Sequence, residues 1–586
     1  MIKLDHFATY QGPGPQADEP VVLVRCTLTD PAAFAPAAAR LAADAEWFRP
    51  PTADTDAELA AAAFLAAWAR ALLNQQEGQI VEAGAFRDET GATAFLGYHH
   101  PQASLQALAL GAHLLASSAR LDVRAVQELT DGFLRKVLPT QPDFQVAILI
   151  AYARRVGLPW RRAGIPGRFW RFGQGARGAM MFESAPMEDS HLGSVLAKDK
   201  AVSKRLFAGL GAPVAPSVVV AEEKDLRAAI AAVGYPCVVK PLDRGRSIGV
   251  TTDVRDAAEL SAAFRVAARE SRTAVMIERQ IEGELLRLIV IRGRLWRAIR
   301  RNRPEAVGDG RSTVAQLLEA LNRTRKAGGD GQPPIGEAPA DDDFRAALRM
   351  QGLTPTDIPA AGRRVRLRNI PLLPPKAHCD DVTAELHPET RAMAEALARR
   401  FGIAVCGLDF ITESPAVSCH AQGAFLEINA TPGLRVPILA GASEDEVART
   451  VLGEKVGRMP SLLVVAPADF EAELRRRIPD DPSLGWACGA SAGLGATRLS
   501  GHAPMTHAAA EIIFEHPDAR AIVIVATAAE LVQHGLPADR FDLAIVLGAA
   551  GLPENWRAVV RRRCGDYVET DDLDQVSRSI TALPRA

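Results

Sequence analysis

The sequence predicts an α/β protein built from several domains. Short apolar runs rich in β-branched residues alternate with Ala-rich stretches of helical periodicity, which is the pattern of strands separated by helices. At 586 residues the chain is too long for one hydrophobic core, since domains commonly span about 100–200 residues. A hydrophobic content of 48% with 24% charged residues is ordinary for a globular protein.

Composition argues against several function classes. The 68 basic and 70 acidic residues nearly balance, so a net charge of -2 creates no global field for nucleic acid or an anionic membrane. The 7 Cys residues are scattered without a C-x-x-C pattern, as expected of reduced, buried thiols. The N-terminal residues lack a signal-like apolar region, and no apolar run reaches the roughly 18 residues of a spanning helix. We therefore expect a cytoplasmic protein with no nucleic-acid partner and no membrane partner.

The first predicted domain covers residues 1–165 and has an α+β texture. Its recognisable elements are a strand-like run and two Ala-rich helical stretches: 21–24, 56–73 and 103–120. No catalytic constellation stands out in it. We interpret the adjacent His99 and His100 as a turn or surface pair, because neighbouring side chains point apart and no further residue completes a metal-ligand set.

The second predicted domain covers residues 166–458, where short strands and helices alternate. The expected strands are 217–220, 235–240, 274–281, 285–291 and 294–299. The expected helices are 222–232, 254–269, 387–402 and one that begins near Val314. The stretch 328–343 contains Gly, Pro and acidic residues without a period, so we predict a flexible loop there.

The third predicted domain covers residues 459–586 and is a small α/β domain. Its apolar runs read as parallel strands separated by helices: 462–466, 521–527 and 543–548.

A magnesium site is predicted from two strands of the second domain. The strand 405–411 carries Asp409, and the strand 424–429 carries Glu427 and Asn429 on one face, because strand side chains repeat every two residues. If these strands pair as a hairpin, three oxygen ligands converge, and oxygen ligation with carboxylates suits Mg²⁺.

Two upstream lysines are candidates for the phosphates of a nucleotide. Lys240 ends a buried strand, and Lys200 lies at the start of a predicted helix. Each feature also has an ordinary structural explanation, since strand-end acids and lysines usually face water. The order and spacing of the whole set favour the functional interpretation: a lysine, a strand lysine, a Gly-containing loop, E-x-x-x-x-G, and then D…E-x-N-x-x-P-G.

That ordered set resembles the ATP-grasp ligases over about residues 190–440. The resemblance implies ATP and Mg²⁺ as cofactors and a carboxylate–amine ligase that forms an acyl phosphate. It implies an adenine hinge formed by four consecutive residues: Glu278, Arg279, Gln280 and Ile281. It further makes Glu284 a candidate for the ribose contact, Arg435 a candidate for gripping the acyl phosphate, and Arg287 a candidate for a phosphate or carboxylate. The alternative for Arg287 is a surface charge on a strand.

Several stretches resemble cyanophycin synthetases in particular. They occur in that family's order: GLPWRRAG (157–164), VVKPLDRGRSIGVTT (238–252), GDGRSTVAQLL (308–318), LHPET (386–390) and LEINATPGLR (426–435). Those enzymes have an N-terminal domain, an ATP-grasp domain and a C-terminal Mur-ligase-like domain with its own P-loop. By this resemblance, residues 1–165 form the substrate- or polymer-binding domain, 166–458 the ATP-grasp catalytic domain and 459–586 a truncated Mur-ligase-like domain.

The C-terminal domain departs from a working Mur ligase. Where the P-loop is expected, the sequence reads PADFEAEL (467–474), without the Gly and Lys that hold phosphate. Ala526 stands where a Mur ligase carries a metal-binding Glu. The chain thus resembles the second type of cyanophycin synthetase, which polymerises β-Asp-Arg dipeptides at one ATP-grasp site. The expected partners are such a dipeptide and a growing polypeptide, in a homo-oligomer (dimer or higher).

Other interpretations remain open. The stretches 243–249 and 372–379 differ from the family pattern, so the substrate can be a different amino acid or dipeptide. A non-catalytic scaffold that partners a full synthetase is a further alternative. GASAG (489–493), with Asp518 and His534, satisfies a Ser-hydrolase pattern, but short matches of this kind are common. The Arg-rich stretch 291–304 is interpreted as a solvated strand face.

Overall fold

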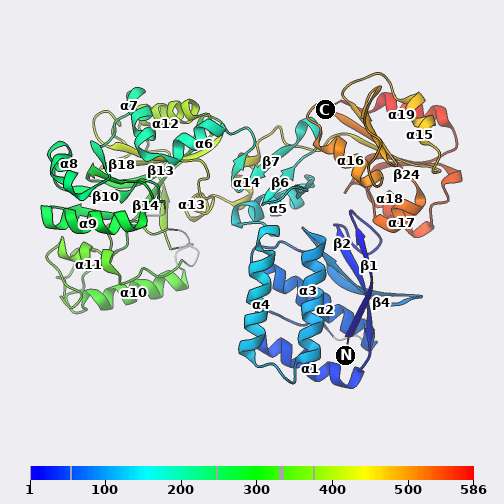
Figure 1. The fold of residues 1–586 in the computed structure, drawn as a ribbon, viewed down its shortest axis with the longest axis horizontal. Coiled ribbons are helices and arrows are strands. Elements are labelled where there is room, and N and C mark those ends of the chain that lie inside the picture. Colours follow the sequence, from blue (N-terminus) through cyan, green and yellow to red (C-terminus); the bar gives the residue numbers. More distant parts are fainter. Residues whose placement is uncertain (1, 53–55, 246–247, 329–334, 374–375, 586) are drawn as a thin grey trace. The chain divides into compact units, whose positions relative to one another are not determined.

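A computed structural model describes residues 2–52, 56–245, 248–328, 335–373 and 376–585. The chain divides into two compact units (Figure 1). The first contains residues 1–183 together with 452–586, and the second contains residues 184–451. Each unit combines sheets with helices, so the predicted α/β class is confirmed. The three-domain division stays a prediction, and both of its boundaries, 165/166 and 458/459, fall inside the first unit.

The N-terminal part of the first unit is a helical layer packed on an antiparallel sheet of order β1-β2-β4-β3. The strands are β1 (Ile2–Tyr10), β2 (Val21–Leu28), β3 (Ala83–Asp88) and β4 (Gly91–Gly97). The helices are α1 (Pro31–Asp44), α2 (Ala57–Asn74), α3 (Pro101–Ser117), α4 (Val123–Val137) and α5 (Phe144–Val156). Small residues let α2 and α3 approach closely, because a Cβ on Gly111 would lie 2.7 Å from Leu65 and 2.8 Å from Trp68.

Helix α2 is the one described helix that is long and apolar enough to cross a membrane, judged by length and composition. No single apolar run had predicted such a helix. Half of it is buried inside the structure, and Leu65, Trp68 and Leu72 belong to the core between the helices and the sheet. This packing is that of a core helix.

The C-terminal part of the first unit is a seven-stranded sheet of order β23-β22-β21-β24-β20-β25-β26. Its strands are β20 (Ser461–Val465), β21 (Leu484–Cys488), β22 (Ser491–Leu494), β23 (Thr497–Ser500), β24 (Ala521–Ala526), β25 (Phe541–Val546) and β26 (Cys564–Glu569). Strand β20 pairs in parallel with β24 and with β25, as the sequence predicts.

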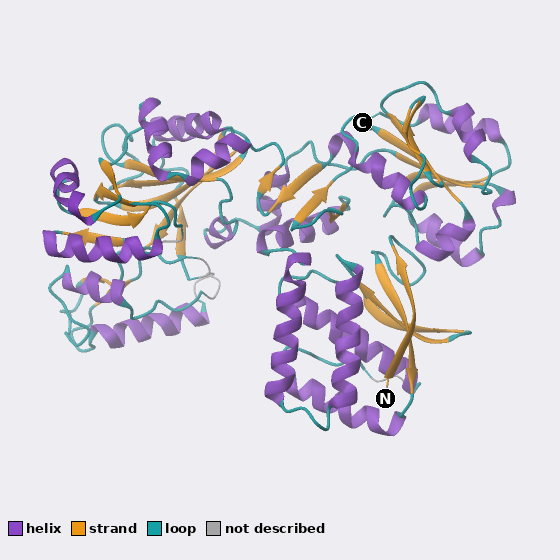
Figure 2. Cartoon of the chain, viewed as in Figure 1, coloured by secondary structure: helices purple, strands orange, loops and turns teal. Residues whose placement is uncertain are grey.

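Helices cover both faces of this sheet (Figure 2). On one face, α16 (Thr506–Glu515), α17 (Ala528–His534) and α18 (Glu554–Arg562) share a core with the strands. On the other face, α15 (Glu471–Arg477) and α19 (Leu573–Ala582) do the same. After α5, the short strand β5 (Trp160–Arg162) pairs with β6 (Phe169–Phe172). Strand β6 also pairs with β7 (Ala179–Phe182).

The second unit is built on two larger sheets and one small one. The first has the order β11-β10-β12-β9, with β9 (Ser217–Val220), β10 (Cys237–Pro241), β11 (Thr251–Val254) and β12 (Val275–Arg279). Its core includes residues of α8 (Leu226–Val233) and α9 (Ala257–Glu270). The second has the order β17-β14-β13-β18-β19, with β13 (Glu284–Ile291), β14 (Arg294–Asn302), β17 (His378–Asp381), β18 (Val405–Thr412) and β19 (Ala424–Asn429). Residues of α7 (Lys200–Gly209) and α12 (Pro388–Phe401) pack in its core.

The small sheet of the second unit pairs β15 (Glu305–Val307) with β16 (Arg364–Arg366). It shares a core with α10 (Val314–Ala327) and α11 (Asp342–Arg349). Thr313 forms a capping box at the start of α10, and Gly402 ends α12 in the left-handed conformation, as predicted from their residue types.

The predicted loop at 328–343 is wrong at its C-terminal end. Residues 329–334 lie outside the described residues. Beyond them, Asn322 binds the backbone of Ala338 through its amide nitrogen and oxygen, and Asp341 caps α11. The acids that suggested a loop instead form the N-cap and first turn of a helix, where negative charge is favoured.

The prediction of a solvated Arg face on 291–304 is also wrong. Arg297 pairs with Asp381 and Glu446, Arg300 pairs with Glu284, and Arg301 is only 7% exposed. The alternation of arginines along β14 had suggested one solvent-exposed face. Acidic side chains of neighbouring elements pair with Arg297 and Arg300 instead.

Candidate active site

A cavity of about 320 Å³ in the second unit collects most of the predicted site residues. It is lined by ten of them: Lys200, Lys240, Glu278, Arg279, Gln280, Ile281, Arg287, Asp409, Glu427 and Asn429. These residues come from α7 and from strands of both large sheets or the segments that follow them, and they include both signs of charge. The cavity is therefore the candidate active site.

One wall contains a buried ion-pair triad formed by Lys240, Glu278 and Lys204. Strands β10 and β12 pair so that Val238 lies opposite Glu278, which puts Lys240 and Glu278 diagonally on the same face. Lys240 Nζ lies 2.5 Å from Glu278 Oε1, and Lys204 Nζ from α7 lies 2.7 Å from Glu278 Oε2. Burial opposes ionisation of Glu278, but the two ammonium groups override it and hold its pKa at about 2.

The opposite wall is a row of charges across three adjacent strands. The register places Arg287 of β13 beside Asp409 of β18, and Asp409 beside Glu427 of β19. Arg287 Nε lies 2.8 Å from Asp409 Oδ1. Gly407 makes room for this arginine, because a Cβ there would lie 2.8 Å from Arg287 Cδ. The predicted hairpin of 405–411 with 424–429 is thus confirmed, and the surface alternative for Arg287 is excluded, since its side chain is 13% exposed.

The two carboxylates of this row titrate in opposite directions. Burial and the neighbouring Glu427 raise the pKa of Asp409 to about 6, in spite of Arg287. Burial also opposes ionisation of Glu427, but Lys240, Arg287 and Lys200 hold its pKa below the usual range. Asn429 donates to Glu427 Oε1 at 3.3 Å, which places an amide beside the acids. A proton shared between the two carboxyl groups, or a bound cation, reduces the repulsion between them.

Lys200 and the hinge segment border the same cavity. Lys200 Nζ donates to the carbonyl oxygens of Leu242 and Arg244, at 3.3 Å and 2.5 Å, and burial lowers its pKa. It is thereby fixed beside the loop that follows β10. Of that predicted Gly-containing loop, 246–247 lie outside the described residues. Arg279 and Gln280 donate backbone N–H groups to Pro216 and Pro236.

Two predicted residues lie elsewhere. Glu284 lines a neighbouring cavity and pairs with Arg300 at 2.6 Å, whereas Leu285 takes its place in the candidate site. Arg435 is the first residue of α13 (Arg435–Leu439) and is not among the residues that line the cavity. The contact of Glu284 with ribose and the contact of Arg435 with the acyl phosphate stay predictions.

The sequence interpretation missed five residues that belong to this region. They are Lys204 behind Glu278 and four that line the cavity: Arg301, Arg303, Arg366 and Asn369. Lys204 had a local signal, because it lies four residues after Lys200 on one helix. The arginines had none, since nothing in a run of alternating arginines distinguishes a cavity wall from a solvated face.

In the described residues, neither GASAG (489–493) nor the pair His99–His100 forms a catalytic or metal site. Ser491 lies in β22 of an antiparallel hairpin and accepts from Arg498 Nη2 at 2.6 Å, whereas a nucleophile elbow joins a strand to a helix. His99 and His100 lie in a bend, which agrees with the predicted turn, but His99 is half-buried: its ring lies 4.9 Å from that of Trp170, and burial lowers its pKa to about 4. No group of three metal-ligating His, Cys, Asp or Glu side chains occurs among the described residues, and the cysteines there are free.

Comparison with known families identifies the class to which the cavity region is similar. Residues 206–299 match the family model described as D-ala D-ala ligase C-terminus. This match includes β10, β12 and β13 with Lys240, Glu278 and Arg287.

Particular relatives are cyanophycin synthetases, so the predicted resemblance is confirmed. The protein of Nostoc sp. is 31% identical over 328 residues, which are 54% of this chain and 36% of that protein. The protein of Trichormus variabilis is 30% identical with the same coverage. A glutathione biosynthesis bifunctional protein of Mannheimia succiniciproducens is 27% identical over 43% of this chain and 34% of its own length. The matches thus span about a third of the length of these curated relatives.

Solved structures to which parts of the chain are similar include a synthetase and a ligase. A bifunctional glutathione synthetase from Pasteurella multocida is 20% identical, with a TM-score of 0.38, and the match covers 60% of this chain and 49% of that one. A D-alanine–D-alanine ligase from Bacillus anthracis, in complex with ATP, has a TM-score of 0.27 over 46% of this chain and 68% of that one.

Proposed function

We propose that this chain is an ATP-dependent carboxylate–amine ligase. The observation that carries the proposal is the meeting, in one cavity, of the Lys240–Glu278–Lys204 triad and the Arg287–Asp409–Glu427 row. Fixed cations on one wall are suited to the phosphates of a nucleoside triphosphate. Paired acids on the other wall are suited to the metal cation that accompanies it.

The paired acids fit a bound Mg²⁺. Asp409 and Glu427 are register partners, so their carboxylates compete for protons and cations, and burial raises the pKa of Asp409 to about 6. Oxygen donors are the ligands that Mg²⁺ prefers. In the proposed enzyme Asp409, Glu427 and Asn429 hold the ion, which neutralises charge on the phosphates when bound.

The remaining residues bind and orient the reactants. Lys200 and Lys240 contact phosphate oxygens, and Lys204 keeps Glu278 ionised so that Lys240 stays in place. A substrate carboxylate oxygen attacks the γ-phosphorus, ADP leaves, and an amine then attacks the acyl carbon and releases phosphate as it loses a proton. Arg287 holds Asp409 in its ionised form, and Arg435 is proposed to contact the acyl phosphate.

The specific reaction that we propose is polymerisation of β-Asp-Arg dipeptides into cyanophycin. It is supported by the similarity to cyanophycin synthetases and by the form of the C-terminal sheet. After β20 the chain continues through Pro467–Phe470 into α15, whose Leu474 is fully buried. This segment has no Gly that would let backbone N–H groups approach a phosphate. A single ATP site is therefore proposed, with the C-terminal part acting as a truncated Mur-ligase-like domain.

Further parts of the proposal concern the surroundings of the enzyme. We expect it to act in the cytoplasm as a homo-oligomer, with residues 1–165 binding substrate or polymer. A growing polypeptide and a dipeptide are its proposed partners.

The ADP-release screen also distinguishes two alternative functions. Glu284 lies away from the candidate cavity, and 372–379 departs from the family pattern, so a different amino acid or dipeptide can be the substrate. A scaffold without catalysis is the second alternative, and the buried ion pairs that line the cavity argue against it.

An ADP-release screen tests the proposal. Purified protein with ATP and Mg²⁺ is offered β-Asp-Arg, free Asp with Arg, and related dipeptides, with and without a polymer primer. ADP release that depends on β-Asp-Arg supports polymerisation. Release with another acceptor only would reassign the substrate, and no release with any acceptor, despite ATP binding, would favour the scaffold.

A further inference from the structure

Two arginines stand at the junction of the candidate site with a second cavity. Arg303 and Arg366 line both the 320 Å³ cavity and a neighbouring cavity of about 670 Å³. Arg303 follows β14, and Arg366 ends β16. The Leu367 N–H donates to the Pro304 oxygen at 2.8 Å, which fixes the two segments side by side.

Within the described residues these two guanidinium groups form no ion pair, in contrast to their neighbours, although Glu282, Asp343 and Glu284 lie close enough to act on the pKa of Arg303. Arg300 pairs with Glu284 and Arg364 pairs with Glu305. Gln351 bonds the backbone N–H and C=O of Arg366, but within the described ranges no ion pair or hydrogen bond involves the guanidinium group of Arg303 or of Arg366, and Arg303 Nε is buried without a partner. Burial and the nearby Arg366 both lower the pKa of Arg303. Two adjacent, partly buried cations of this kind are costly unless an anion joins them.

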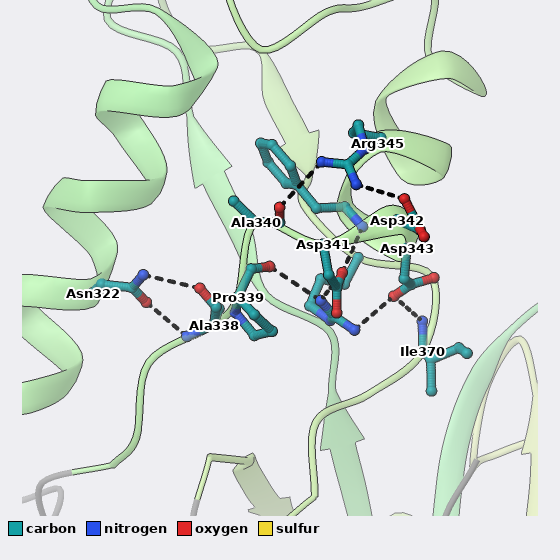
Figure 3. Close-up of polar contacts among 11 residues, drawn as sticks. Asn322, Ala338, Pro339, Ala340, Asp341, Asp342, Asp343, Arg345 and Ile370 are labelled. Atoms are coloured by element: carbon teal, nitrogen blue, oxygen red, sulfur yellow. Dashed lines mark hydrogen bonds and ion pairs between the residues drawn. The ribbon is translucent and has the colours of Figure 1, made fainter. Parts of the chain in front are cut away.

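The backbone segment that follows Arg366 is fixed by two ion pairs and a hydrogen bond. Arg368 pairs with Asp341 at 2.6 Å and with Asp343 at 3.2 Å, and the Ile370 N–H donates to Asp343 at 3.3 Å. Figure 3 shows these acids at the start of α11 pointing toward the segment that contains Ile370. The segment between β16 and Ile370 is therefore preorganised for binding.

Asn369 adds a third unpartnered group to this wall. It lies between Arg368 and Ile370, lines the candidate cavity, and has both amide atoms buried without a hydrogen-bond partner among the described residues. Buried amides are normally satisfied, so this one points to a ligand that supplies a donor or an acceptor.

We propose that Arg303 and Arg366, with Asn369 beside them, bind a carboxylate of the amine substrate. This inference rests on the proposed ligase function and names the substrate class: an amino acid or short peptide with a free carboxylate and a cationic group. Guanidinium forks bind carboxylates in two-pronged geometry. The second cavity also has acidic lining residues that suit the cationic group and would repel a phosphate tail: Glu282, Glu284, Glu305, Asp380 and Glu413.

Calorimetric binding with matched ligand pairs tests the assignment. The probes are L-arginine against L-argininamide, and β-Asp-Arg against the amide of each of its two carboxylates, with Mg²⁺ and a non-hydrolysable ATP analogue present. For the wild type we expect about 10- to 100-fold tighter binding of a free carboxylate than of its amide, as for other hydrogen bonds to charged groups. Arg303→Gln and Arg366→Gln should each bring this ratio close to one, and the Lys variants should restore it in part.

Controls separate this inference from the ligase proposal. Arg345→Gln changes an exposed arginine of the same region, on α11, and should keep the wild-type ratio. Weaker binding of the ATP analogue by the Gln variants, with an unchanged carboxylate–amide ratio, would assign the pair to a phosphate and overturn the inference. A wild type that shows no preference for any free carboxylate would overturn it too. If the analogue does not bind the wild type at all, the ligase proposal fails, and the ratio measured without nucleotide still tests the arginine pair.

Discussion

The five-stranded sheet of the second unit and the seven-stranded C-terminal sheet use buried polar residues in different ways. In the former, Arg287, Asp409 and Glu427 lie side by side on neighbouring strands and line a cavity. In the helices α16 and α17 that cover the latter, the buried Thr506 donates to Glu530 at 2.8 Å, and the buried His507 contacts the Gly535 oxygen at 2.9 Å.

The difference shows what a buried polar group is for in each sheet. Thr506, Glu530 and His507 Nε2 bond to other groups of the chain, so these contacts stabilise the fold, although His507 Nδ1 has no partner among the described residues. The charges of the five-stranded sheet face a space large enough for a ligand and retain competing carboxylates. Similar strand and helix scaffolds thus serve chemistry in one case and structure in the other.

The largest expected effect is loss of catalysis in the charged cavity. Glu427→Gln keeps the shape of the side chain and removes its charge, and Lys240→Ala removes a phosphate contact together with a partner of Glu278. Each should lower the rate of ADP release by at least about 10²–10³-fold, as for loss of one preorganised charge-stabilising group. Glu444→Gln, at an exposed position at the start of α14 (Glu444–Leu452), is the control. Activity within tenfold of wild type in both variants would contradict the site assignment.

Loss of stability in the second unit is the next effect. Lys204→Met leaves one oxygen of the buried Glu278 without its cation, so the free energy of unfolding should fall by about 3 kcal/mol. Urea unfolding compares this variant with Lys198→Met, which changes an exposed lysine of the preceding helix. Equal unfolding midpoints for the two variants would show that Lys240 alone holds Glu278.

Acid should weaken the C-terminal sheet through His507. Burial lowers the pKa of His507 from its ordinary 6.5 to about 4, so between these values the unfolded chain binds a proton that the folded chain does not. The free energy of unfolding therefore falls as the pH drops through this window, by about 2 kcal/mol between pH 7 and pH 5. His507→Gln should reduce that dependence in thermal unfolding, whereas His113→Gln, at an exposed position, should not. A slope unchanged by His507→Gln would reject this role.

The smallest effect concerns the segment where a P-loop is expected. Asp469→Asn changes an exposed acid just before α15, and Glu471→Gln changes a half-buried acid at the first residue of that helix. Stability should change by less than about 0.5 kcal/mol, as is usual for surface substitutions, and ADP release should stay at the wild-type rate. Strong loss of activity in a folded variant would mean that the C-terminal part takes part in chemistry.

Much of the candidate site was predictable because it depends on local periodicity. The two-residue repeat of a strand places Glu427 and Asn429 on one face, and the hairpin with 405–411 brings Asp409 opposite Glu427. Glu284 was not placed correctly by the same logic. It starts β13, where a neighbouring arginine, Arg300 of β14, determines which cavity it faces.

Sequence by itself determined the order of strands and helices, the hairpin that carries the acids, and the identity of Lys240 as a buried strand residue. Only the tertiary structure decided that Lys204 pairs with Glu278 and that the guanidinium groups of Arg303 and Arg366 line one cavity without an ion-pair partner among the described residues. The reason is physical: side-chain direction within a strand or helix follows from backbone geometry, whereas the partner of a charge follows from the packing of elements that are distant in the chain.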